Sequence, residues 1–100
     1  MKYLTIIPDY TGSCVQDDFD GKIEIDRLGL PSQFVEEILS WHADYRGIIP
    51  LSDNQRLAKM DVIEKLDNKG LKIAQKLEDL VPGGAKVKYF SEGKLKFLEK

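Results

Sequence analysis

The residue types from which metal sites and disulfides are built are scarce in this chain of 100 residues. Cys14 is the only cysteine and His42 the only histidine. A lone cysteine cannot form a disulfide within the chain, which favours a reducing, cytoplasmic setting. One cysteine and one histidine cannot complete the ligand set of a zinc site either. We therefore expect no metal and no cofactor.

Long hydrophobic runs are also missing. A membrane-spanning helix needs roughly 20 consecutive apolar residues, whereas the apolar stretch at the N-terminus ends at Pro8. That stretch is too short for the hydrophobic core of a signal peptide and predicts a strand instead. We therefore expect no association with a membrane.

Motifs for catalysis are absent as well. Residues 82–86, PGGAK, lack the glycine spacing and the Lys-Ser/Thr ending of a phosphate-binding loop. A catalytic His42 would need an orienting acid or a nucleophile close by. Asp44, two positions further on, faces away from it on a helix. A structural histidine is the simpler interpretation, so we do not expect an enzyme.

Charge, in contrast, is plentiful and unevenly distributed. The formal net charge is only −2. Residues 1–50 nevertheless carry nine acids against four Lys/Arg, a balance of −5, and residues 51–100 carry eight acids against eleven, a balance of +3. A negative field in one half of the chain favours a basic partner and disfavours nucleic acid at that face.

Acidic residues are densest in residues 15–26, VQDDFDGKIEID. Five carboxylates are offset there by Lys22 alone, and they belong to Asp17, Asp18, Asp20, Glu24 and Asp26. Alignment with a calcium-binding EF-hand loop fails, because Gln16 occupies its first position and Arg27 its twelfth, where calcium needs a bidentate acid. The segment is then either a solvated acidic turn or a surface for a basic partner. Tyr10 and Phe19 would be aromatic anchors in such a surface.

The hydrophobic pattern predicts a single α+β domain over residues 1–100. Strands are expected at residues 3–7, 22–26, 86–90 and 94–98, and the two main helices within residues 30–47 and 61–81. The order β-β-α-α-β-β favours one antiparallel sheet with both helices packed on it. Two points stay open: residues 56–60 can extend the second helix backwards, and that helix can break near Gly70, which otherwise marks close contact with a neighbour.

Periodicity assigns faces to two of these elements. In the first helix, spacings of four, three and four predict a core-facing stripe made of Phe34, Ile38, Trp41 and Tyr45. In the C-terminal hairpin, alternation places the apolar Val87, Tyr89, Leu95 and Phe97 on one face and Lys86, Lys88, Lys94 and Lys96 on the other. The lysine face is a candidate for nucleic acid. The acidic composition and the aromatics on the opposite face favour a solvated strand with edge-protecting lysines instead.

Three stretches of the chain, taken together, carry a resemblance to a known family. The first is the N-terminal strand that runs into the acidic turn and IEIDRLGLP, residues 23–31. The second is the helix SQFVEEILSWHADYRG, residues 32–47, and the third is LDNKGLKIAQKLEDLVPGGAKVKYFSE, residues 66–92. In this layout the chain resembles small cytoplasmic immunity proteins of bacterial toxin systems, in particular those paired with contact-dependent growth inhibition toxins.

The resemblance implies a non-enzymatic inhibitor that binds a toxin domain and blocks its active site or a surface that it needs. Many of these toxins are nucleases with basic clefts, and an acidic face can occupy the position of the phosphates. Each immunity protein is fitted to its own toxin, so no individual residue is transferred from the family. We expect the chain to be a monomer or weak dimer without direct contact to nucleic acid.

On this hypothesis the acidic segment supplies the partner-binding residues, namely Tyr10, Asp17, Asp18, Phe19, Asp20, Glu24 and Asp26. The alternative hypothesis is a small regulatory or nucleic-acid-associated domain that uses the lysine-rich C-terminal hairpin.

Overall fold

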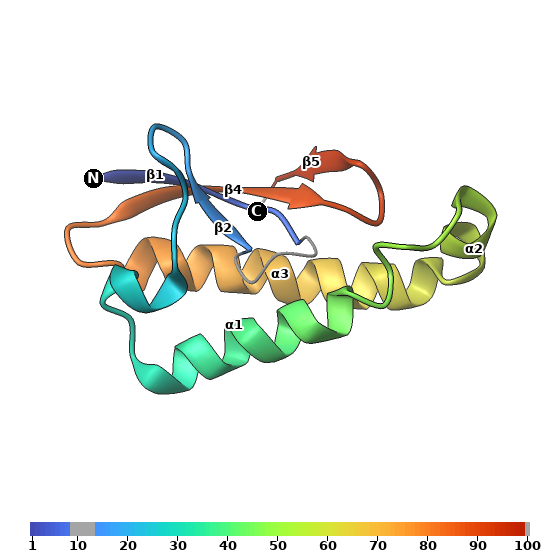
Figure 1. The fold of residues 1–100 in the computed structure, drawn as a ribbon, viewed down its shortest axis with the longest axis horizontal. Coiled ribbons are helices and arrows are strands. Elements are labelled where there is room, and N and C mark those ends of the chain that lie inside the picture. The colour runs from blue at the N-terminus through green and yellow to red at the C-terminus, as the bar shows by residue number, and fades with distance from the viewer. Residues whose placement is uncertain (9–13, 100) are drawn as a thin grey trace.

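Strands from the two ends of the chain form a sheet, and the helices lie between them in the sequence (Figure 1). The structure is a computed structural model that describes residues 1–8 and 14–99. Its elements are β1 (Lys2–Ile6), β2 (Val15–Asp17), β3 (Gly21–Lys22), a 3-10 helix η1 (Ile25–Leu28), α1 (Ser32–Tyr45), α2 (Asp53–Ala58), α3 (Met60–Leu80), β4 (Ala85–Ser91) and β5 (Lys96–Leu98). The predicted α+β class and the succession of strands, helices and strands are confirmed.

The sheet is mixed rather than antiparallel as predicted. Its strand order is β3-β2-β1-β4-β5. The central strand β1 is antiparallel to β2 but parallel to β4, with Leu4 opposite Val87. Parallel strands need a long crossover connection, and the helices between β1 and β4 provide it. The sequence pattern gives the order of the elements but not the direction in which distant strands pair, so it did not reveal this crossover.

The predicted strand at residues 22–26 is wrong over most of its length. Strand β3 ends at Lys22, and Ile25–Leu28 form a 3-10 turn that closes at Gly29 with φ of 71°. Ile25 and Leu28 are both buried, which a spacing of three allows in a 3-10 turn but not in a strand. Strand β2 was missed, because aspartate is depleted from strands and its sequence is Val-Gln-Asp.

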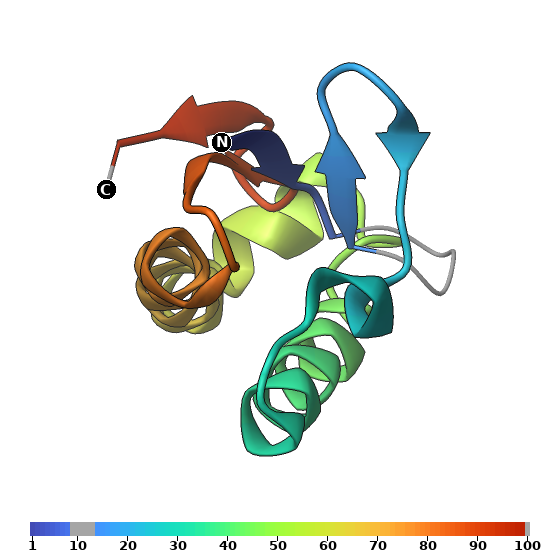
Figure 2. The same ribbon diagram turned by 90° about the vertical axis from the view of Figure 1, so that its left-hand side faces the viewer.

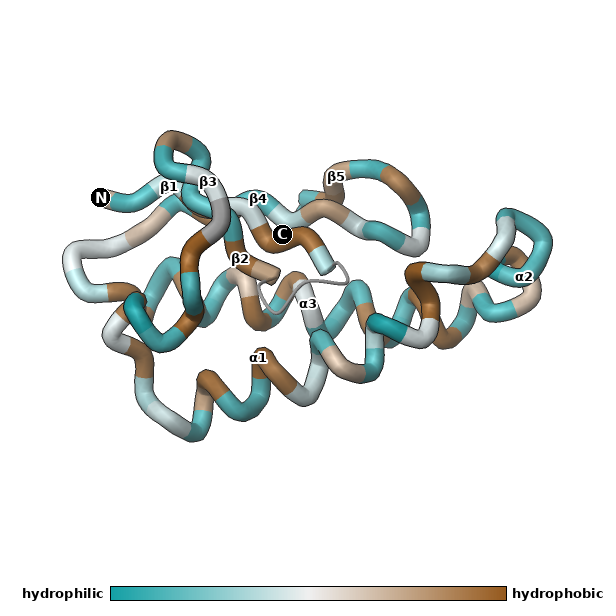
Figure 3. The backbone as a smooth tube through the Cα atoms, in the orientation of Figure 1, coloured by the Kyte–Doolittle hydropathy of each residue, from teal (hydrophilic) through white to brown (hydrophobic). Residues whose placement is uncertain are grey.

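Both long helices lie on the same side of the sheet, as the end-on view shows (Figure 2). The stripe predicted for α1 is confirmed as core, since Phe34, Ile38, Trp41 and Tyr45 are all buried. The ring of Trp41 lies 5.6 Å from that of Tyr45 and 6.0 Å from that of Tyr89 in β4. Hydrophobic and hydrophilic segments alternate along α1 and α3, as expected of helices with one buried side (Figure 3).

The structure answers both open questions about the second long helix. Helix α3 runs from Met60 to Leu80 without a break at Gly70. Lys59 separates it from the short helix α2, so residues 56–60 do not form a simple extension. A Cβ atom on Gly70 would overlap the ring of Tyr89. The glycine therefore allows α3 to approach β4 closely.

A buried carboxylate joins the helices to the sheet. Asp67 of α3 accepts hydrogen bonds from the hydroxyls of Tyr45 at 2.9 Å, Tyr89 at 2.7 Å and Ser91 at 2.7 Å. Tyr45 in turn accepts the backbone N–H of Gly93 at 2.8 Å. Burial, opposed in part by the hydrogen bonds to Ser91 and Gly93, raises the pKa of Tyr45 to about 12. Burial and the hydrogen bond to Asp67 also raise the pKa of Tyr89.

Candidate functional site

The predicted acidic segment begins with a tight turn between β2 and β3, here called the acidic turn (residues 17–20). The carboxylate of Asp17 accepts the backbone N–H groups of Phe19 at 2.8 Å and Asp20 at 3.1 Å. These two hydrogen bonds lower the pKa of Asp17 below its ordinary value of 3.8. The residue is only 7% exposed. Asp17 therefore fixes the turn, and its part in a partner-facing surface stays a prediction.

Asp18 is tied to the neighbouring strands. One of its carboxylate oxygens accepts the hydroxyl of Thr5 at 2.6 Å, and the other lies 3.4 Å from the Nζ atom of Lys88. Its backbone N–H also donates to the carbonyl of Tyr3 at 2.9 Å. The ion pair is solvent-exposed on the lysine side, so its contribution to stability is small. Asp18 can still add negative potential to the acidic turn.

Phe19 is the most exposed large hydrophobic residue that the structure describes, with 81% of its surface in contact with solvent. Its only described ring partner is Tyr3, whose centroid lies 5.8 Å away in an edge-on arrangement. Asp20 beside it is also exposed. The acidic turn thus presents an aromatic ring and a carboxylate on a backbone that Asp17 holds in place.

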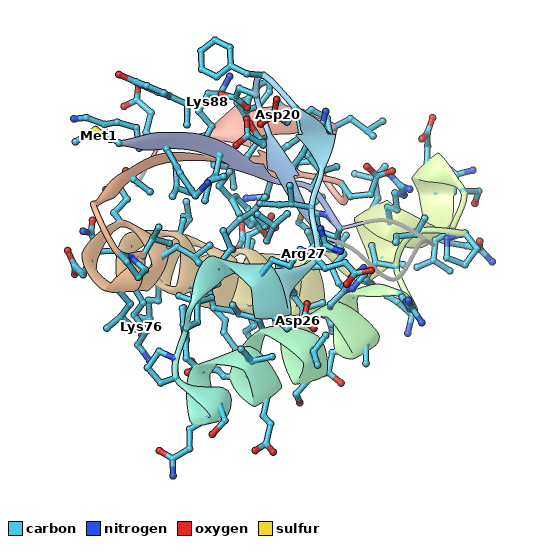
Figure 4. The ribbon with its side chains drawn as sticks, turned by 60° about the vertical axis from the view of Figure 1, so that its left-hand side comes forward. Met1, Asp20, Asp26, Arg27, Lys76 and Lys88 are labelled. Carbon is cyan, nitrogen blue, oxygen red and sulfur yellow. The ribbon has the colours of Figure 1, made fainter. Side chains whose placement is uncertain are left out.

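Two other predicted residues, Glu24 and Asp26, do not belong to the acidic turn. Glu24 precedes the 3-10 helix η1, and Asp26 lies in its first turn; both are exposed. Figure 4 shows Asp20 at the top of the acidic turn and Asp26 much closer to α1. The carboxylates therefore form two groups rather than one phosphate-like patch. Tyr10 lies outside the described residues.

The four lysines of the C-terminal hairpin do not share a face. The loop of residues 92–95, here called the hairpin loop, sets a register in which Phe97 lies opposite Phe90 and Lys96 opposite Ser91. Phe90 and Phe97 lie on the outer side of the sheet, with ring centroids 5.1 Å apart. The Nζ atom of Lys88 lies 5.7 Å from the Phe97 centroid. The prediction that Phe97 shares the inner face with Tyr89 is wrong.

Lys94 and Lys96 instead border a groove between α2 and the hairpin loop. It has a volume of about 500 Å³, and we call it the loop groove. Its lining includes Arg56, Leu57, Met60, Lys94, Leu95 and Lys96. This site has no signal in the sequence, because its residues come from two segments that only the fold brings together.

His42 and Asp67 are two of the buried polar side chains. His42 is 2% exposed. The buried carboxylate of Asp67 is already occupied by three hydroxyls. The burial of Asp67 has a signal in the sequence, since Ile63, Asp67 and Gly70 fall on one helical stripe. Within residues 1–8 and 14–99, no group of three or more His, Cys, Asp or Glu side chains could hold a metal ion.

None of the described helices combines the length and apolar character needed to cross a membrane. Comparisons of the chain with protein-family models, with curated proteins and with solved structures gave no match. The features of the described residues that can indicate a function are therefore the acidic turn, the outer face of the sheet and the loop groove.

Proposed function

We propose that this chain is an immunity-type inhibitor, which binds a bacterial toxin domain and neutralises it without catalysing a reaction. The observation that carries the proposal is the acidic turn, where Phe19 is exposed on a backbone fixed by Asp17. A phenyl ring held in water gains free energy when a partner covers it. A turn that is already fixed loses little conformational entropy on binding, so more of that free energy appears as affinity.

The charge around the ring indicates the kind of partner. Asp18 and Asp20 flank Phe19 in the sequence, and both contribute a negative potential at the tip. Such a potential attracts a basic cleft, like that of a nuclease, and raises the association rate. Glu24 and Asp26 lie further away and add to the long-range field rather than to the same contact.

The test is co-expression with the product of the adjacent reading frame, which on this proposal is the toxin domain. That domain should stop growth, and the wild-type chain should restore it. Phe19→Ala should raise the dissociation rate by about tenfold or more, because a buried aromatic anchor is lost. Reversal of Asp20 to Lys should instead slow association, most strongly at low salt. Surface-binding kinetics at two salt concentrations separate the two effects.

Leu39→Ala is the matched control, since Leu39 is another exposed apolar residue but lies on α1. It should leave both rates unchanged, and circular dichroism should show that all variants fold. A neighbouring product that is not toxic, or that the chain does not bind, would contradict the function itself. Binding that tolerates Phe19→Ala would contradict only the assignment of the acidic turn.

A second candidate function is supported by the outer face of the sheet. Lys86 and Lys88 point outward from β4, and the structure places Phe90 and Phe97 on that face as well. Aromatic rings interleaved with lysines are typical of surfaces on which single-stranded nucleic acid stacks. In the sequence, nucleic acid was disfavoured because the aromatic residues were expected on the face opposite the lysines. Phe97 instead lies on the same face as Lys86 and Lys88.

Fluorescence anisotropy with labelled single-stranded oligonucleotides tests this alternative. Binding should weaken steeply as salt rises and should be lost in a Lys86→Glu, Lys88→Glu double variant. Phe97→Ala should reduce affinity without changing the salt dependence, because stacking carries no charge. If the wild-type chain does not change the anisotropy at low salt, this alternative is wrong.

A further inference from the structure

The loop groove exposes two large apolar side chains that come from different segments of the chain. Leu57 in α2 is 68% exposed and Leu95 in the hairpin loop is 58% exposed. Both line the groove, with Met60 at the start of α3 between them in the sequence. Its volume of about 500 Å³ lies within the range of sites that bind ligands.

The walls of this groove are fixed to each other by Arg56. Its guanidinium donates hydrogen bonds to the backbone carbonyls of Ile49 at 2.8 Å, Leu51 at 3.1 Å and Glu92 at 2.6 Å. The third of these carbonyls belongs to the hairpin loop, and Gly93 of the same loop donates to Tyr45. The relative position of α2 and the loop is therefore set before any ligand binds.

Leu95 has a strained backbone conformation. Its φ of 55° is in the left-handed region, and it is the only described residue other than glycine with positive φ. Asparagine or glycine is favoured at such a position, and a bulky apolar side chain there is strained. Burial does not compensate for the strain, because most of the side chain is exposed. Strained residues of this kind concentrate at functional sites.

The charge of the lining residues is mainly positive, although Glu92, whose carboxylate lies 3.9 Å from Arg56, offsets part of it. Lys94 and Lys96 border the groove on the hairpin side, and Asp53 is its one carboxylate among the lining residues that the structure describes. The Nζ atom of Lys94 lies 4.0 Å from the exposed carboxylate of Glu64, at the limit of an ion pair. A carboxylate of a ligand can replace so weak a contact.

We propose that the loop groove is a docking site for an acidic peptide segment of a partner protein. An apolar side chain of the segment lies between Leu57 and Leu95, and its flanking carboxylates pair with Lys94 and Lys96. Charge complementarity supports this occupant, because the lining combines Lys94 and Lys96 with the exposed apolar side chains of Leu57 and Leu95. The site is separate from the acidic turn and has the opposite charge, so it does not depend on the toxin proposed above.

Selection from a phage-displayed library of random dodecapeptides on the immobilised full chain tests the proposal. We expect peptides with an aliphatic or aromatic residue flanked by Asp or Glu. Each selected peptide is then measured by anisotropy against Leu95→Asn and Leu57→Gln. Asparagine tolerates positive φ and glutamine favours a helix, so both variants keep the backbone. Affinity should fall by about tenfold in each, the equivalent of one lost apolar contact.

The Leu95→Asn variant separates a binding role from a structural one. It should unfold at the same temperature as the wild type or at a higher one, because strain is relieved while binding is lost. The Lys94→Glu, Lys96→Glu double variant should reject the acidic peptides. No enrichment, a basic or neutral consensus, or peptides that bind all variants equally would overturn the proposal. Concentration-dependent self-association of the wild type that Leu95→Asn abolishes would also overturn it, since the occupant would then be a second copy.

Discussion

The acidic turn and the hairpin loop are two tips that each expose one large apolar side chain, yet they are held in different ways. In the acidic turn, Asp17 fixes residues only two and three positions away. The hairpin loop is held by side chains distant in the sequence, with Gly93 bonded to Tyr45 and the carbonyl of Glu92 bonded to Arg56. The acidic turn is thus held by Asp17 and by contacts of Asp18 with the neighbouring strands, whereas the hairpin loop is held by Tyr45 and Arg56. Mutations in the core should therefore affect the two tips unequally.

The largest effect is expected from Asp67→Ala. The change leaves three buried hydroxyls without their common acceptor, and we expect the free energy of unfolding to fall by about 3 kcal/mol or more. The hairpin loop should loosen before the acidic turn does. Urea unfolding gives the free energy, and amide hydrogen exchange compares the two tips. Asp61→Ala, in the exposed first turn of the same helix, is the control; a loss below about 1 kcal/mol for Asp67→Ala would contradict the account.

Glycines at the two tips provide the next comparison. A Cβ atom on Gly93 would lie 2.6 Å from Ile63 Cγ2, so Gly93→Ala should cost about 1–3 kcal/mol through overpacking. Gly21, which follows the acidic turn, has open space around it but a φ of 84°. Gly21→Ala should cost about 1–2 kcal/mol through backbone strain.

Asparagine distinguishes these two causes. Gly21→Asn should be tolerated better than Gly21→Ala, because asparagine accepts positive φ. Gly93→Asn should be worse than Gly93→Ala, because the larger side chain meets the same wall. Thermal unfolding of the four variants measures the order. The same order at both positions would mean that the two tips are constrained in the same way.

Extremes of pH should act on the two tips separately. The pKa of Asp17 is lowered on folding, so its stabilising effect is present above 3.8 and is lost as the pH falls through the folded value. The pKa of Tyr45 is raised from 10 to about 12, so the unfolded chain loses its proton first and stability falls as the pH rises through that interval. Amide chemical shifts of Phe19 and Gly93 should follow acid and alkali respectively. Equal responses of both at each extreme would contradict the comparison.

The smallest effect is expected from the ion pair that joins Asp18 to Lys88. Because the pair is exposed, a double-mutant cycle with alanine should give a coupling energy of about 0.2–1 kcal/mol, reduced further by salt. A larger coupling would mean that the acidic turn depends on the sheet as well as on Asp17.

Features formed by residues close together in the sequence were predicted better than features formed by residues far apart in it. The stripe from Phe34 to Tyr45 and the hairpin were predictable, because helical and strand periodicity are local signals. The separation of Lys88 from Lys96 was not, since it depends on the length of the hairpin loop and on the φ of one leucine. The loop groove was invisible for the same reason. Of the candidate site, the exposure of Phe19 and the structural role of Asp17 needed coordinates, and the part of Phe19 as a partner-binding anchor stays a prediction.

The parallel pairing of β1 with β4 also has a consequence for how the chain folds. Strand β1 leaves the ribosome well before its partner β4, which begins only at Ala85. Pairings this far apart in the sequence have high contact order and slow folding. The central strand must therefore wait until nearly the whole domain has been synthesised, with Leu4 and Ile6 not yet covered by the completed sheet. A nascent chain stopped after α3 should remain sensitive to protease, and extension through β4 should make it resistant in a single step.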